Sequence, residues 1–152
     1  PVTLQDLEAQ IGQELGVSEW VELTQEKLDT FADVTGDRDW LHNEPEKVAA
    51  AGVFGGKTIA QGHLLLSHFV RFGEAIMPRP DGMEYALNYG YDRVRVVRPV
   101  TVGSKIRGRM TLKNVRAKNP KQFIIKCTAQ IETDDSDQPA VIADWLFFVQ
   151  LA

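Results

Sequence analysis

Two side chains that can move protons, Asp37 and His42, lie close together in the first half of the chain. A carboxylate and an imidazole have ordinary pKa values of about 3.9 and about 6.5, so near neutral pH both can be unprotonated and one water molecule can bridge them. Gly36 is expected to end a helix, which places both residues on one short connection before the next helix. The alternative is structural, with Asp37 capping a turn and His42 packing against its neighbours.

Gly62 is a second candidate because we expect it to begin a helix. The first N–H groups of a helix have no partner within it, and the helix dipole is positive there, so they can stabilise an oxyanion. A glycine also lets a substrate approach the backbone closely, although its role can equally be structural. An acid–base pair with oxyanion donors favours chemistry beside a polarised carbonyl, such as water addition to a conjugated thioester.

Other reactive residue types are scarce. The single cysteine, Cys127, excludes an internal disulfide, and its alternation with apolar residues predicts a buried, inert thiol. The three histidines, His42, His63 and His68, disfavour a dedicated metal cage, since the last two do not share a helix face well. We therefore predict no metal site.

The composition is that of one soluble domain, residues 1–152, with 43% hydrophobic and 25% charged residues. A net charge of −4 disfavours general attraction to nucleic acid or to an anionic membrane. The longest apolar stretch, residues 64–70, is far too short to span a membrane, and the first residues do not resemble a signal peptide. We expect a cytoplasmic protein with no nucleic-acid or membrane partner.

The elements that must position these candidates are helices in the first half of the chain. Helical spacing joins Leu4, Leu7 and Ile11, and a second helix is expected between an N-cap at Thr24 and Gly36. A short helix follows from Pro45 to the stop at Gly52, then a loop over 54–57. The longest helix, over 62–76, is apolar nearly all round and is therefore predicted to be buried.

The second half of the chain has the period of strands. Apolar residues alternate over 104–113 and 121–133, and Asn119-Pro120 predicts a hairpin turn between them. Within 84–97 the apolar residues change from one face of the strand to the other, and a bulge near Gly90 would account for this change. The last strand, 140–151, is apolar on both faces and is expected to be covered on both sides. Helices followed by antiparallel strands predict an α+β fold in which a sheet surrounds the helix over 62–76.

The central segment resembles the MaoC-like family of (R)-specific enoyl-CoA hydratases and dehydratases. The family pattern is about T-G-D-x-N-P-x-H, followed by G-x-x-I-A-H-G and an apolar helix. The matching residues here are Thr35, Gly36, Asp37, His42, Gly56, Ile59, Ala60 and Gly62. Asp39-Trp40, in place of Asn-Pro, and the segments 88–95 and 99–100 are similar to the branch that includes nodulation protein N, so the resemblance spans most of the chain.

This resemblance implies a hot-dog fold, usually dimeric, that adds water to trans-2-enoyl-CoA thioesters to give (R)-3-hydroxyacyl-CoA. It assigns Asp37 and His42 as the catalytic pair and the Gly62 backbone N–H as the thioester-binding group. The pair would hold the water that attacks C3 and return a proton to C2, with the formal base left open. It implies acyl-CoA as the substrate, a homodimer as the assembly and no cofactor beyond the coenzyme A of the substrate.

The chain departs from the family pattern at three further places. Gln61 replaces the usual histidine before Gly62, His63 replaces a residue that is commonly apolar, and Val70 stands where some members have a serine. Two other functions stay open on the same fold. One is an acyl-CoA thioesterase, although the Asp37–His42 pair favours hydration because water addition must both remove and supply a proton. The other is a non-catalytic acyl-binding or signalling protein.

Overall fold

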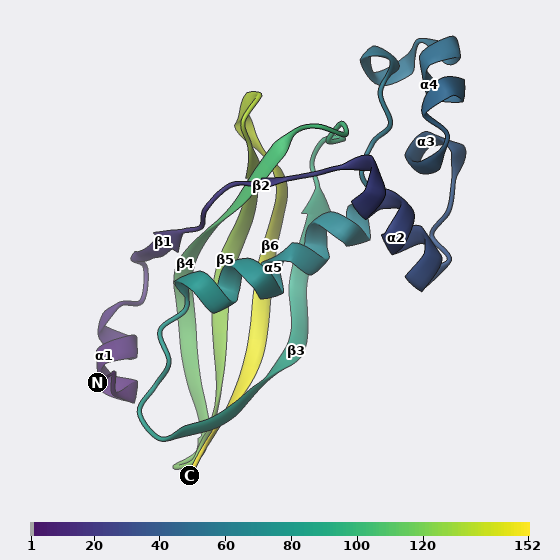
Figure 1. Ribbon diagram of the computed structural model, residues 1–152. Helices are drawn as coiled ribbons and strands as arrows, with labels where there is room; N and C mark the ends of the chain where they lie inside the picture. The colour runs from purple at the N-terminus through teal and green to yellow at the C-terminus, as the bar shows by residue number, and fades with distance from the viewer. Residues whose placement is uncertain (1) are drawn as a thin grey trace.

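The computed structural model describes residues 2–152, which form an antiparallel sheet with a long helix laid across one face (Figure 1). The major strands are β3 (Met83–Val96), β4 (Lys105–Asn119), β5 (Gln122–Thr133) and β6 (Ser136–Leu151). Two short strands, β1 (Glu14–Val17) and β2 (Val21–Glu22), both pair with β4, and the sheet order is β1-β4-β5-β6-β3. The four long strands and the α+β class confirm the prediction, whereas β1 and β2 were not predicted because each is too short to show alternation.

Two local features of the sheet are also confirmed. β4 and β5 are joined through a tight turn at Pro120 and Lys121, and the register of β3 against β6 shifts between Asn88 and Gly90. Cys127 is fully buried in the sheet, and this burial raises the pKa of its thiol to about 12. The thiol therefore stays protonated and inert near neutral pH.

The helix α5 (Gly62–Ile76) has the predicted bounds, and its sheet side carries the core residues Leu65, Phe69 and Phe72. It approaches the sheet closely: a Cβ built on Gly108 of β4 would lie 2.6 Å from the Phe72 Cβ atom. The prediction that α5 is buried is confirmed for the side that faces the sheet and is wrong for the opposite side. Val70, Arg71 and Glu74 are exposed, because only one side of the helix faces the sheet.

The two faces of the final strand are covered to different extents. Its inner face, which includes Trp145 and Val149, is buried beneath α5 or the adjoining core. On its outer face Ile142, Leu146 and Phe148 are only partly buried, and long side chains such as Lys118, whose Nζ lies 5.9 Å from the Phe148 ring centroid, give partial cover. Within residues 2–152 no helix packs on the outer face (Figure 1), so cover of that face stays a prediction.

The edge strand β3 carries the large exposed apolar surface. Six of its apolar and aromatic side chains are between 36% and 57% exposed: Tyr85, Leu87, Tyr89, Tyr91, Val94 and Val96. Within the described part of the chain, β3 pairs only with β6, so its other edge has no strand partner. A long apolar edge of this kind is normally covered in solution, because unpaired backbone groups and apolar side chains both promote association.

The helices of the first half form two groups. α1 (Leu4–Ala9) begins with a capping box between Thr3 and Asp6 and ends before Ile11, which is exposed, so the predicted helix was too long. α2 (Gln25–Thr35), α3 (Trp40–Asn43), α4 (Pro45–Ala51) and the 3₁₀ turn η1 (Val53–Gly56) belong to residues 25–61, the helical excursion, which stands beyond one end of the sheet (Figure 1).

Within the helical excursion, the ends of α2 and α4 follow the sequence prediction. Thr24 caps α2, which ends at Gly36 with a φ of 78°, and α4 ends at Gly52 with a φ of 69°. Two details were missed: His42 lies in the one-turn helix α3 rather than on a loop, and much of the predicted loop 54–57 is η1.

Among residues 2–152, no helix is both long and apolar enough to cross a membrane. The single-domain organisation and the cytoplasmic location stay predictions.

Candidate active site

The three predicted site residues lie where the helical excursion meets the start of α5. Asp37 follows the end of α2, His42 lies in α3, and both are partly exposed. Gly62 is the first residue of α5. Two hydrogen bonds join these pieces of chain: the His42 ring bonds to Ile59 O, and the Gln61 side chain bonds to Asp37 O.

The contact of the His42 ring determines its protonation pattern. Nδ1 lies 2.6 Å from the main-chain oxygen of Ile59. A carbonyl oxygen can only accept, so Nδ1 must carry the proton, and in the neutral ring the lone pair is on Nε2. The acceptor is itself held in place, since Ile59 forms a bridge with Thr101 and Ala60 N donates to Val100 O at 2.8 Å. His42 Nε2, which has no hydrogen-bond partner among residues 2–152, is therefore an oriented proton acceptor.

A polar network holds the backbone on which His42 sits. Gln25 Nε2 donates to His42 O at 2.8 Å and to Asp29 Oδ1 at 3.0 Å, while the buried Thr58 hydroxyl donates to Gln25 Oε1 at 2.6 Å. Asn43 Nδ2 donates to the same Asp29 oxygen at 2.9 Å. The hydrogen bond from Asn43, and then that from Gln25, lowers the pKa of Asp29 below its ordinary value. The network thus ties α2, α3 and the segment before α5 together.

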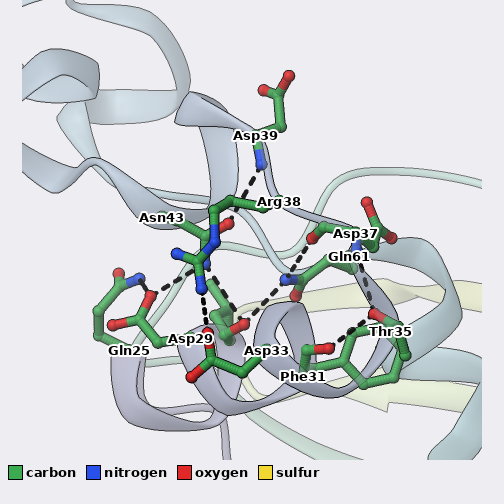
Figure 2. Close-up of polar contacts among 11 residues, drawn as sticks. Gln25, Asp29, Phe31, Asp33, Thr35, Asp37, Arg38, Asp39, Asn43 and Gln61 are labelled. Carbon is green, nitrogen blue, oxygen red and sulfur yellow. Dashed lines mark hydrogen bonds and ion pairs between the residues drawn. The ribbon is translucent and has the colours of Figure 1, made fainter.

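Asp37 is held by its main chain, and its carboxylate is left available. Its N–H donates to Thr35 Oγ1 at 3.2 Å, and its carbonyl oxygen accepts from Gln61 Nε2 at 3.3 Å (Figure 2). Within residues 2–152 no donor bonds to the Asp37 carboxylate. The second carboxylate, Asp39, caps α3 by accepting from Leu41 N at 2.9 Å, and in Figure 2 it points away from Gln61 and Asp37.

Gly62 begins α5 without a side-chain cap, because Gln61 occupies the N-cap position and its side chain is used elsewhere. Its N–H is one of the helix amides that have no partner four residues earlier within α5. A Cβ built on Gly62 would lie 3.3 Å from Val96 Cγ2, so the end of β3 passes close to the start of the helix. The glycine therefore leaves its N–H group accessible where a side chain would crowd β3.

A groove of about 370 Å³ runs between the second half of α5, β3 and β6. It is partly open to solvent, and most of its lining is apolar. The lining includes Val70, Gly73, Met77, Leu87, Trp145 and Phe147. At its inner side Trp145 Nε1 donates to Asn88 Oδ1 at 3.2 Å, which satisfies the indole N–H. Such a groove is suited to an unbranched apolar chain.

Sequence analysis missed the residues that support the pair. Gln25, Asp29, Asn43 and Thr58 gave no periodic or motif signal of their own, and Gln61 was noted only as a departure from the family pattern. The one available signal was the position of Thr58 and Gln61 in a segment that is otherwise buried, since fully buried polar side chains normally need specific partners.

The chain is similar to a known protein family and to several named proteins. Residues 6–134 match the MaoC like domain. The chain is 38% identical to nodulation protein N of Rhizobium leguminosarum bv. viciae, over 98% of this chain and 92% of that protein. It is 39% identical to 3-hydroxyacyl-thioester dehydratase Z of Mycobacterium tuberculosis (strain ATCC 25618 / H37Rv), over 91% of this chain and 90% of that protein.

Solved structures share the fold at lower identity. The (R)-hydratase from A. caviae superposes with a TM-score of 0.72 at 22% identity, covering 93% of this chain and 96% of that one. The MaoC-like dehydratase from Rhodospirillum rubrum gives a TM-score of 0.77 at 18% identity, covering 100% and 99%. The chain belongs to the MaoC-like dehydratase family. Its fold is the hot-dog fold of that family, and its activity is that of a hydro-lyase.

The lowered pKa of Asp29 predicts a pH-dependent contribution to stability. Because the folded chain binds this proton less tightly than the unfolded chain, the contribution is present above the ordinary pKa of about 3.9 and is lost as pH falls through the lowered value. Asp29→Asn keeps an acceptor oxygen but removes the titrating charge. We expect it to lower the urea midpoint at neutral pH, and the difference from wild type to shrink as pH falls below about 4.

Glu26→Gln, which removes a carboxylate from the exposed side of the same helix, is the matched control and should leave the acid dependence close to wild type. A difference between wild type and Asp29→Asn that stayed constant throughout the acid range would contradict the role given to the network.

Proposed function

We propose that the protein adds water to trans-2-enoyl-CoA thioesters to give (R)-3-hydroxyacyl-CoA, and catalyses the reverse dehydration. The observation that carries this proposal is the orientation of His42. Its Nδ1–H is held by Ile59 O, and its Nε2 is left as an acceptor in the same site as the unbonded Asp37 carboxylate. A relative named as a 3-hydroxyacyl-thioester dehydratase and a structural neighbour named as an (R)-hydratase support the same reaction.

In the proposed reaction, one water molecule lies between His42 Nε2 and the Asp37 carboxylate. Nε2 takes a proton from this water as its oxygen bonds to C3, and the electron pair of the C2–C3 double bond moves toward the thioester oxygen. The Gly62 N–H stabilises that developing oxyanion at the positive end of α5. The imidazolium, stabilised by the Asp37 charge and Ile59 O, then returns its proton to C2, so one water is added in total.

Replacing either member of the pair should abolish most of the turnover. Asp37→Asn keeps the size of the side chain and removes its charge, and His42→Ala removes the proton carrier. We expect each to lower kcat for hydration of crotonyl-CoA by roughly 10²- to 10⁴-fold, with a smaller change in KM. The double variant should lose little more than the worse single variant, because both groups act on one water.

The assay follows loss of the enone absorbance and release of free thiol in parallel. Asp33→Asn, which removes an exposed carboxylate from α2, is the matched control and should keep wild-type turnover. Near-wild-type hydration by both single variants would show that the pair is structural. Fast thiol release that depends on Asp37, without hydration, would replace the proposal with a thioesterase, and wild-type inactivity in both assays would favour an acyl-binding protein.

The groove beside α5 is the proposed site of the acyl chain. Val70 lies on α5 about 12 Å beyond Gly62, at a rise of about 1.5 Å per residue, and it lines the groove. Gly73, one turn further on, lies against Trp145. A thioester held at Gly62 would place the first carbons of its chain near the start of α5 and only later carbons at Val70. The outer part of the groove therefore determines which acyl-chain lengths are bound, and it does not contribute to the chemical step.

Filling the groove should therefore discriminate between substrates. We expect Val70→Trp to keep turnover of crotonyl-CoA close to wild type and to lower kcat/KM for a medium-chain trans-2-enoyl-CoA by roughly tenfold or more, because the longer chain loses its apolar contacts. Arg71→Trp adds the same ring to the neighbouring exposed position and is the control. Equal losses for both substrates, or for both variants, would exclude the groove as the chain site.

A homodimer is the proposed assembly, through the open edge of β3. A second copy can supply a complementary edge strand and the apolar cover that the exposed β3 side chains need, because a two-fold interface uses the same patch on both subunits. The inner side of the sheet is covered by α5, and the exposed large apolar side chains of the four long strands lie on β3.

Sedimentation of the wild-type protein at micromolar concentration should give twice the 17.0 kDa chain mass. We expect Leu87→Lys combined with Tyr89→Lys to shift the protein to monomer, since each substitution places a charge on the apolar edge. Val34→Lys, at an apolar position on α2 that is 80% exposed, should leave the dimer intact. A wild-type monomer would contradict the proposed assembly.

A further inference from the structure

Gln61 occupies an unusual position in the site. Its side chain is fully buried, and it is the residue immediately before Gly62. Its amide nitrogen donates to the main-chain oxygen of Leu28 at 2.9 Å. It also donates to the main-chain oxygen of Asp37 at 3.3 Å (Figure 2). One side chain thus connects the interior of α2, the backbone of the catalytic carboxylate and the first turn of α5.

The two acceptors define the orientation of the amide. Both are carbonyl oxygens, which cannot donate, so the –NH₂ group must face them and Oε1 must face away. Oε1 is buried and has no hydrogen-bond partner among residues 2–152. A buried acceptor without a partner destabilises the folded state, whereas an apolar side chain of the same shape would avoid that penalty. Stability alone is therefore a poor reason for an amide at this position.

The Leu28 carbonyl is a shared anchor for both halves of the catalytic pair. It accepts from Gln61 Nε2 and also, at 3.4 Å, from Asn43 Nδ2, which belongs to the residue after His42. Leu28 is itself fully buried in α2, so this anchor belongs to the packed core. Asp37 is tied to it through Gln61, and His42 is tied to it through Asn43.

We propose that Gln61 is a positioning residue: its amide sets the place of Asp37 relative to the Gly62 N–H, and thereby the place of the attacking water relative to the thioester. Gln61 does not touch the reacting atoms. The inference rests on the proposed hydratase function, because it concerns the geometry between the water-holding carboxylate and the oxyanion donor of that reaction. A displacement of about 1 Å in such a geometry is sufficient to slow a reaction substantially.

The test uses Gln61→Met, which retains the length of the side chain and removes both the donors and the orphaned acceptor. We expect kcat for crotonyl-CoA hydration to fall roughly 10- to 100-fold, with KM within about threefold of wild type. The urea midpoint should stay close to that of wild type, because removal of the unpartnered oxygen offsets the loss of the two donated hydrogen bonds. Gln130→Met makes the same change on β5, away from the site, and should alter neither kcat nor the midpoint substantially.

Gln61→Glu gives a second readout that a packing role would not produce. The introduced carboxyl group faces two carbonyl oxygens and can donate to one of them only when it is protonated. The kcat of Gln61→Glu should therefore rise relative to that of wild type as pH is lowered and fall as pH rises. The kcat of Gln61→Met relative to wild type should show no such change with pH. The proposal would be overturned if the ratio of kcat in Gln61→Glu to kcat in wild type were the same at all pH values. It would also be overturned if Gln61→Met kept the kcat of wild type.

Hydrogen exchange of the peptide that contains residues 36–43 separates this inference from the proposed function. In Gln61→Met that peptide should exchange faster than in wild type, while α5 stays protected. If wild type does not hydrate crotonyl-CoA but this exchange difference is present, the function fails and the positioning contact stands. If wild type is active and the exchange is unchanged, the positioning role fails alone.

Discussion

The close packing of α5 on the sheet is the constraint on which the rest of this structure depends. A methyl group at Gly108 would overlap Phe72, and one at Gly73 would lie 2.8 Å from the Trp145 ring. The helix therefore lies at a depth that only glycine permits at these two contacts. That depth also sets where α5 begins, so the Gly62 N–H emerges at the end of the sheet, beside Val96, where the helical excursion can reach it.

The helical excursion is positioned in a different way. Standing beyond the end of the sheet, it buries only a few apolar side chains, such as Leu28 and Val48, and relies on directional hydrogen bonds for its placement. The bonds of His42 to Ile59, of Gln25 to His42 and of Gln61 to Asp37 each cross between separate segments. Directional bonds specify orientation as well as proximity, and the bond to Ile59 O fixes which nitrogen of the His42 ring is left as an acceptor.

On the outer face of the sheet, two basic residues of β4, Arg107 and Arg109, are engaged in ion pairs. Glu132 of β5 accepts from Arg107 at 2.9 Å and also pairs with Arg109, which in turn reaches Glu14 at 2.5 Å. The hydrogen bond from Arg109 is the main cause of the lowered pKa of Glu132. These charges stabilise one another across three strands, and the alternation that exposes them is the same alternation that buries Ile106 and Met110 against α5.

The sequence by itself determined the features whose physical cause is local. The bounds of α5, the caps of α2 and the alternation of the four long strands follow from periodicity and from residues such as Thr24 and Gly36, and the motif singled out Asp37, His42 and Gly62. Only the tertiary structure decided which side of α5 is covered and showed that β3 is an open edge. It also showed that His42 carries its proton on Nδ1 and that Gln61 joins Asp37 to α5. Each of these depends on residues distant in sequence, and a polar side chain such as Gln61 has the same local pattern whether it meets water or two buried carbonyl groups.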